Sequence, residues 1–396
     1  MPRTLFLDQT GQLGGAELSL RDIAARYRTN SLVVLFEDGP FRRMLEDDGT
    51  PVRVLAQAGR GDAGFGVARS SSLGRGLVGL GRMAPQVTRV ARLAREFDLI
   101  YANTQKALVV GTIAAAVARR PLVFHLHDLL IPAHFSPANR RASVLLANRA
   151  TRIIANSAAT VESYVAAGGI GERTEVIEYS FEPPSHPVEE QPIDRGARFG
   201  VELEPEAYVV GCFSRLSPWK GQHVLIEALT HCSDDVVAVI VGGALFGEDD
   251  YAAGLSRQVH DLGLEGRVHF LGFRSDVPRL MAACDLVAHT SNDPEPFGRV
   301  IVEAMLSGRP IVATSAGGVL DLVEDGVDGR LSRPGDPHHL AQVIMAGRAD
   351  LEGSATMAAR ARERATARFA PEVIAPQIDR VLRQAARTHP RNEVAP

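Results

Sequence analysis

Two carboxylates bracket the stretch of this 396-residue chain in which residue types and spacing most clearly suggest chemistry. Glu295 and Glu303 flank an apolar run, and the prolines and glycine at its front predict a loop that turns into a helix. Since an α-helix rises about 1.5 Å per residue, the carboxylates should lie on the order of 12 Å apart, which suits the two ends of one elongated ligand. The backbone N–H groups of Phe297 and Gly298 would lie at the open helix start, which favours anionic or hydroxyl-rich ligands. A buried helix with two incidental surface acids would show the same spacing.

A second candidate site combines two cations with a tight turn. Arg215 and Lys220 flank a Ser-Pro-Trp turn that follows an expected strand at 207–213. The planar guanidinium and the compact ammonium could both reach one diphosphate. Fixed cations are one way to neutralise such a leaving group, and a divalent metal is the other. The acidic run 248–250 precedes an expected helix, where we interpret it as an N-terminal cap rather than a metal site.

Further candidates lie where strands of the N-terminal half should end, since ligands of parallel sheets collect at the carboxyl ends of strands. His127 ends one expected strand, and His125, two residues earlier on the same strand face, is its nearest competitor. A purely structural histidine is the alternative. Asn103, Thr104 and Lys106 follow another expected strand and are candidates for the acceptor side of a site.

The elements that must position these residues alternate between strand and helix through both halves of the chain. This alternation predicts an α/β fold with parallel sheets and helical crossovers. The first strand, at 3–8, is followed by a glycine turn and a helix, although the G-x-G-x-x-G spacing is absent. Gly15 stands at that helix start, where the backbone could approach a ligand closely. A mere tight turn is the alternative.

In order and spacing, these motifs resemble glycosyltransferase family 4 over nearly the whole chain, most specifically from Gly211 to Pro337. The family comprises retaining, nucleotide-sugar-dependent enzymes of the GT-B fold. That fold has two Rossmann-like domains facing each other across a cleft, and a C-terminal helix that returns to the first domain. The chain departs from many relatives at Tyr179, which begins Tyr-Ser-Phe-Glu where they have Asn-Gly.

The resemblance implies a role for each matching residue. The donor diphosphate would be bound by Arg215, Lys220 and Gly15. The donor sugar would meet Glu295, Phe297, Gly298 and His127, of which Glu295 and His127 would be catalytic. The nucleoside would be bound by Glu303 and by the loop that contains Arg274.

The length and the composition limit the domain organisation and the possible binding partners. We expect an acceptor-side domain at 1–182, a linker with a short leading helix at 183–206, a nucleotide-sugar-binding domain at 207–370, a returning helix at 371–390 and a disordered tail at 391–396. The net charge of -4 argues against nucleic acid as a partner. Sparse cysteines and the absence of C-x-x-C and H-E-x-x-H spacings predict no disulfide framework, no bound metal and a cytoplasmic location.

Membrane contact is a separate question. The longest apolar stretch, at 107–118, holds twelve residues, against the roughly 20 that a spanning helix needs. Arginine is dense between residues 60 and 95, and the glycine- and serine-rich parts at 59–66 and 70–81 predict a mobile loop there. The arginines form either a solvated helix face or a basic surface for anionic lipid at the inner face of the cytoplasmic membrane.

These expectations combine into one activity. The chain would move a hexosyl unit from a UDP- or GDP-linked sugar to a glycan or lipid-linked glycan acceptor, without cofactor or metal, in cell-surface polysaccharide or glycoconjugate biosynthesis. Retention would proceed through Glu295 as a covalent nucleophile, or by front-face attack in which a phosphate oxygen takes the proton. The second route is favoured because no other carboxylate is clearly dedicated to acid/base work. The alternatives are a sugar-nucleotide epimerase on the same fold and a catalytically silent nucleotide-sugar-binding protein.

Overall fold

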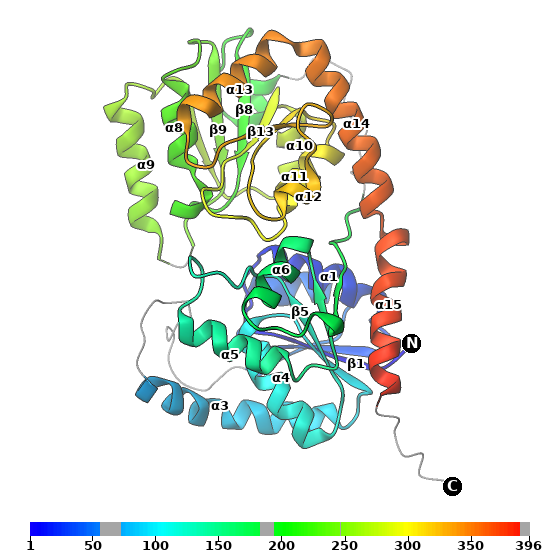
Figure 1. The fold of residues 1–396 in the computed structure, drawn as a ribbon. Coiled ribbons are helices and arrows are strands. Elements are labelled where there is room, and N and C mark those ends of the chain that lie inside the picture. Colours follow the sequence, from blue (N-terminus) through cyan, green and yellow to red (C-terminus); the bar gives the residue numbers. More distant parts are fainter. Residues whose placement is uncertain (56–72, 183–193, 246, 389–396) are drawn as a thin grey trace. The chain divides into compact units, whose positions relative to one another are not determined.

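The computed structural model describes residues 1–55, 73–182, 194–245 and 247–388. The chain forms two compact units (Figure 1). The first comprises Met1–Ser180 with Pro371–Pro396, and the second comprises Phe181–Ala370. Each unit has a parallel sheet between helices, so the α/β prediction is confirmed.

The first unit is built on a seven-stranded sheet in the order β3-β2-β1-β4-β5-β6-β7. Its strands are β1 (Thr4–Asp8), β2 (Ser31–Leu35), β3 (Val52–Val54), β4 (Leu99–Ala102), β5 (Leu122–Leu126), β6 (Arg152–Ala155) and β7 (Thr174–Val176). Every residue of β1, β4 and β5 is buried, as parallel strands covered on both faces require. The carboxyl ends of these three neighbouring strands therefore lie side by side at one edge of the sheet.

Helices cover both faces of this sheet. The helices of the first unit are α1 (Gly15–Arg26), α2 (Pro40–Asp47), α3 (Leu73–Ala94), α4 (Gln105–Ala118), α5 (Pro137–Ala147), α6 (Ala158–Ala166), the 3₁₀ turn η1 (Gly171–Arg173) and α15 (Pro371–Arg387). One apolar cluster joins the sheet to α3, α4 and α5, and another joins its opposite face to α1, α2 and α15. The last helix thus belongs to the core of the first unit, where Tyr27 donates a hydrogen bond to Asp379.

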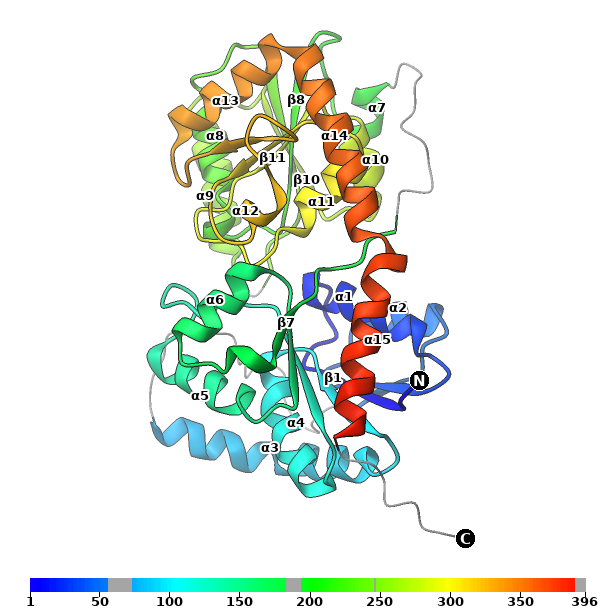
Figure 2. The same cartoon turned by 45° about the vertical axis from the view of Figure 1, so that its right-hand side comes forward.

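The second unit has a six-stranded parallel sheet in the order β10-β9-β8-β11-β12-β13. Its strands are β8 (Tyr208–Phe213), β9 (Val236–Val241), β10 (Val268–Gly272), β11 (Leu286–His289), β12 (Ile311–Thr314) and β13 (Arg330–Ser332). Its helices are α7 (Arg195–Phe199), η2 (Pro218–Lys220), α8 (Gln222–Leu229), α9 (Asp249–Asp261), α10 (Val277–Ala282), α11 (Arg299–Leu306), α12 (Val319–Leu322), α13 (Pro337–Ala349) and α14 (Leu351–Phe369). Helices α8, α9 and α13 pack on one face, and α14 packs on α11 (Figure 2).

The structure tests the loop and the linker that the sequence predicts. Helix α3 begins at Leu73, so the loop predicted at 70–81 is wrong from that residue on. Helix α7 is the short helix expected within the linker 183–206, and it is tied to the second unit by Arg195, whose Nη1 lies 2.6 Å from Asp285 Oδ2. Residues 183–193, the predicted tail 391–396 and residues 60–72 lie outside the described residues. Within the described part of the chain, no helix is long and apolar enough to cross a membrane.

Candidate functional site

The loop that carries Glu295 is fixed by its backbone. Strand β11 ends at His289, and the chain then runs irregularly to α11. Gly318 donates its N–H to the carbonyl of Glu295 at 2.8 Å. Gly317 has φ +64°, and a Cβ there would lie 2.4 Å from the same carbonyl oxygen. The close approach of these two segments therefore requires glycine at 317, and it holds Glu295 beside the end of β12.

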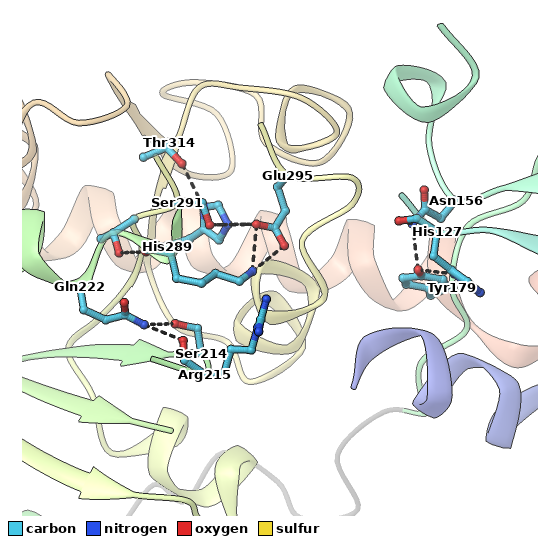
Figure 3. A network of polar contacts seen from close by, with 12 residues as sticks. His127, Asn156, Tyr179, Ser214, Arg215, Gln222, His289, Ser291, Glu295 and Thr314 are labelled. Carbon is cyan, nitrogen blue, oxygen red and sulfur yellow. Dashed lines mark hydrogen bonds and ion pairs between the residues drawn. The ribbon is translucent and has the colours of Figure 1, made fainter. Parts of the chain in front are cut away.

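The Glu295 carboxylate is buried and fully partnered (Figure 3). Lys220 Nζ lies 2.7 Å from its Oε1 and 3.0 Å from its Oε2. Ser291 Oγ donates to Oε2 at 2.8 Å, and His289 Nε2 lies 3.4 Å from the same oxygen. Burial alone would raise the pKa of Glu295, but the Lys220 ammonium and the contact with His289 hold it well below its ordinary value. Glu295 is therefore an ionised carboxylate across the neutral range and a poor proton acceptor.

The two predicted cations converge on one aromatic ring. Lys220 Nζ lies 4.0 Å from the centre of the Trp219 ring, and Arg215 Cζ lies 5.7 Å from it. The turn between them is held by Gln222, whose Nε2 donates to the carbonyl of Arg215 at 2.8 Å. Arg215 Nη1 also lies 3.3 Å from Glu248 Oε2. Glu248 is the N-cap residue of α9, with Asp249 and Asp250 in the first turn, as expected for the acidic run. The Glu248 side chain makes no cap hydrogen bond, however, and holds Arg215 and Ser217 instead.

The remaining predicted residues of the second unit lie on separate elements. The Phe297 ring is buried against Phe181 and Phe369, so only its backbone remains for a ligand. Gly298, with φ +102°, directly precedes α11. Glu303 Oε1 lies 3.6 Å from Arg299 Nε on that helix. Arg274, which follows β10, forms a two-pronged ion pair with Asp276, at 2.9 and 2.7 Å.

In the first unit, a chain of hydrogen bonds fixes the His127 ring. Asn103 donates its Nδ2 to Asp8 Oδ2 at 2.7 Å, which turns its carbonyl oxygen to His127 Nε2 at 2.9 Å. A carbonyl can only accept, so Nε2 carries a hydrogen. His127 Nδ1 lies 2.7 Å from the Tyr179 hydroxyl, which accepts a hydrogen bond from Asn156 Nδ2 at 2.8 Å (Figure 3). Both ring nitrogens of His127 are thus engaged within the unit.

Of the other residues predicted in the first unit, only some lie at this hydrogen-bond network. Asn103 joins it directly, and the His125 ring lies 3.9 Å from the His127 ring, centre to centre, on the same face as expected. Thr104 precedes α4, and Lys106 Nζ pairs with Glu37 at 3.5 Å.

Two buried acids, Asp8 and Glu17, lie next to the same hydrogen-bond network. Burial raises the pKa of Asp8 to about 6. Burial, with a contribution from Asp8, raises the pKa of Glu17 to about 8. Gly15 is the first residue of α1, and a Cβ on the preceding Gly14 would lie 2.6 Å from Glu17 Oε2. The glycine turn therefore leaves room for this carboxyl group.

No role in a site was assigned from the sequence to four residues of these networks: His289, Ser291, Asn156 and Tyr179. Their one signal is position, since each follows or ends a strand. Among the described residues, no group of three or more histidine, cysteine or acidic side chains could hold a metal ion.

Comparison with known proteins identifies the family. Residues 195–364 match the family model of glycosyl transferases group 1, and residues 41–179 match that of glycosyltransferase family 4. The crystal structure of Anabaena Alr3699/HepE in complex with UDP-glucose is 49% identical in sequence, with a TM-score of 0.87. That match covers 97% of this chain and 100% of the other. The chain belongs to the GT-B glycosyltransferases.

Other glycosyltransferases are more distant. The lipopolysaccharide core biosynthesis glycosyltransferase LpsE of Rhizobium meliloti is 32% identical over 45% of this chain. The D-inositol 3-phosphate glycosyltransferase of Mycobacterium marinum is 36% identical over 37% of it. These matches span 50% and 32% of the two relatives. WaaG, a glycosyltransferase involved in lipopolysaccharide biosynthesis, is 16% identical with a TM-score of 0.68, which shows the shared fold alone.

The predictions of the family and of the GT-B fold are thus confirmed. As a glycosyltransferase, the chain presents Glu295 and Lys220 as one buried pair, with Arg215 beside the same tryptophan. His127 lies in a network of its own within the first unit. The role of each of these residues in the reaction is still a prediction.

Proposed function

We propose that this protein transfers glucose from UDP-glucose with retention of configuration, without a metal, to a glycan or lipid-linked glycan. The observation that carries the proposal is the likeness to Anabaena Alr3699/HepE, which was solved with UDP-glucose and matches over its entire length at 49% identity. The match covers 97% of this chain and therefore extends over both units.

The donor-side geometry supports charge neutralisation by side chains. Lys220 and Arg215 flank Trp219 and can approach one diphosphate together, as a point charge and a planar fork. Fixed cations of this kind can stabilise a departing UDP without a metal.

The state of Glu295 favours front-face attack. Its depressed pKa and its contact with Lys220 suit it to accept hydrogen bonds from sugar hydroxyls rather than to take a proton. The acceptor oxygen would bond to the anomeric carbon as the bond to UDP breaks, and the departing phosphate oxygen would take the acceptor's proton. Catalysis would then consist mainly of positioning and electrostatic stabilisation.

Charge in the first unit bears on the acceptor. Residues 73–150 contain eleven lysines and arginines but three acids. Arg89 and Arg92 on α3 are exposed, as are Arg141 on α5 and Arg149 just after it, with exposed Leu145 between the latter two. A basic surface with apolar side chains suits the anionic inner face of the cytoplasmic membrane. It therefore supports a membrane-bound acceptor, in keeping with the lipopolysaccharide role that LpsE carries in its name.

The first experiment is a thermal-shift panel of UDP, GDP, ADP and their sugars, with and without EDTA. A ligand present at 100 times its dissociation constant stabilises the folded state by about 2.7 kcal/mol, which gives a readily measured shift. We expect UDP and UDP-glucose to stabilise the wild type in EDTA and to lose most of that effect in Lys220→Met. A response to GDP or ADP alone would refute the proposed donor. Binding without transfer to any glycan or lipid-linked glycan acceptor would favour a silent binding protein.

A further inference from the structure

The histidine next to Glu295 has partners that suit two protonation states. His289 Nδ1 lies 3.2 Å from Thr314 Oγ1, and its Nε2 lies 3.2 Å from Ser291 Oγ (Figure 3). Hydroxyl groups both donate and accept, so they can serve a neutral ring and a protonated one. His127 differs, because Nε2 of that ring faces the carbonyl oxygen of Asn103.

Donor binding changes the charge around Glu295. Among the described contacts of this carboxylate, Lys220 supplies the positive charge, and His289 is the other group that can become a cation. A diphosphate that binds Lys220 competes with Glu295 for the ammonium group. The buried Glu295 carboxylate then has less compensation than before, which is costly in a poorly solvated site.

We infer that His289 takes up a proton when the nucleotide sugar binds, and that together with Ser291 it keeps Glu295 ionised and in place. This inference rests on the proposed function. The protonated ring would donate Nδ1–H to Thr314 and Nε2–H to the Ser291 oxygen, while Ser291 still donates to Glu295. His289 and Ser291 are thus positioning residues that act through Glu295.

The groups that face His289 support this assignment. Glu295 approaches from the loop before α11, and Lys220 stands behind it on η2. Thr314 of β12 is neutral. On the β8 side, Cys212 lies next to Thr290, and burial raises the pKa of this thiol, so it remains neutral. Among the described contacts of the ring, the single full negative charge is therefore that of Glu295.

Isothermal titration of the full chain with UDP-glucose tests the inference. Titrations near pH 7 in buffers of different ionisation enthalpy give the number of protons bound with the ligand. UDP-glucose is the right probe because its diphosphate, substituted at both ends, does not titrate in this range. We expect uptake of at least about half a proton, and an affinity that falls by up to about tenfold per pH unit as the pH rises.

Two variants separate this linkage from a structural effect. His289→Gln retains a hydrogen-bonding side chain but should abolish proton uptake and flatten the pH dependence of binding. The control is His260→Gln, because His260 is exposed and pairs with Glu265 at 2.8 Å, away from these contacts. A structural role alone would weaken binding in His289→Gln without changing the proton count.

The possible failures can be told apart. Binding of UDP-glucose to the wild type without proton uptake would overturn the inference and leave the proposed function in place. Proton uptake that persists in His289→Gln would also overturn it. A wild type that does not bind UDP-glucose would remove the proposed function, and the inference with it. The wild-type measurement does not depend on whether a variant folds.

Discussion

Replacing Lys220 by methionine should destabilise the second unit, by an amount that depends on pH. Methionine retains most of the apolar stem and removes the charge, so Glu295 loses its main counter-ion. The two side chains are 14% and 11% exposed, which makes this a largely buried pair. Removing one partner of a buried ion pair costs about 3–5 kcal/mol.

Protonation of Glu295 sets an upper limit to the penalty of leaving its buried carboxylate without a counter-ion. From the ordinary glutamate pKa of 4.5, neutralising the carboxyl costs about 4 kcal/mol at pH 7.5 but less than about 1 kcal/mol at pH 5. In the wild type the lowered pKa stabilises the fold above pH 4.5, and this contribution is lost as the pH falls. In the variant, burial raises the pKa instead, so the penalty is present at high pH and relieved as the pH falls. We therefore expect a loss of about 3–4 kcal/mol at pH 7.5 that is smaller at pH 5, because protonation of Glu295 then relieves the penalty in the variant.

The assay is urea unfolding followed by circular dichroism, which reports both units, and by the fluorescence of Trp219, the single tryptophan of the chain, which reports the second unit. Lys106→Met is a matched control, because Lys106 is the other lysine of the sequence. It pairs with Glu37 at 3.5 Å, and that carboxylate is 59% exposed, so the variant should change stability little. A loss below about 1 kcal/mol at pH 7.5, or one of equal size at both pH values, would refute this reasoning.

Three further predictions concern other parts of the molecule. Gly317→Ala should destabilise the second unit and reduce transfer, because its Cβ would lie 2.4 Å from the Glu295 carbonyl; Gly266→Ala, with open space around its Cβ, should not. Urea unfolding and a transfer assay measure both effects, and a fully active Gly317→Ala would contradict the close approach. Tyr179→Phe removes the hydroxyl that faces His127 Nδ1 and should reduce kcat more than it changes KM for UDP-glucose. An unchanged kcat would show that the hydrogen-bond chain has no catalytic effect. Transfer by protein treated with EDTA should match that of untreated protein, and loss of activity restored by Mg²⁺ or Mn²⁺ would refute the metal-independent route.

The alternation of strands and helices could be predicted because both sheets are parallel and buried. Their strands appear in the sequence as short apolar runs, and the polar residues that follow them mark the strand ends. His127 became a candidate in this way, whereas Glu295 and Lys220 became candidates through the spacing of the carboxylates and the charges beside a tight turn. The start of helix α3 was missed because glycines at 70–81 suggested a loop, whereas Val90 and Ala94 further along the helix pack against the first sheet and α4. Tertiary packing outweighs local propensity there.

The partners of the site residues could not be predicted, because they come from distant positions. Tyr179 lies 52 residues from His127 in the sequence, yet their side chains are hydrogen-bonded. Glu248 appeared to be a helix cap by position, but its carboxylate holds Arg215 across 33 residues. A one-dimensional pattern shows which residues end a strand. It does not show which neighbouring strand or loop supplies the hydrogen-bond partner.

The ion pairs of the donor side imply that donor binding exchanges partners rather than adding charges. Each predicted cation already has a carboxylate: Lys220 has Glu295, Arg215 has Glu248, and Arg274 has Asp276. The pairing keeps the cations compensated without a donor, and a diphosphate must compete with those carboxylates. The affinity should therefore be smaller than the separate contacts would suggest, and single substitutions should not add. Lys220→Met and Glu295→Gln combined should weaken binding less than the sum of their separate effects, because each variant already removes the partner of the other.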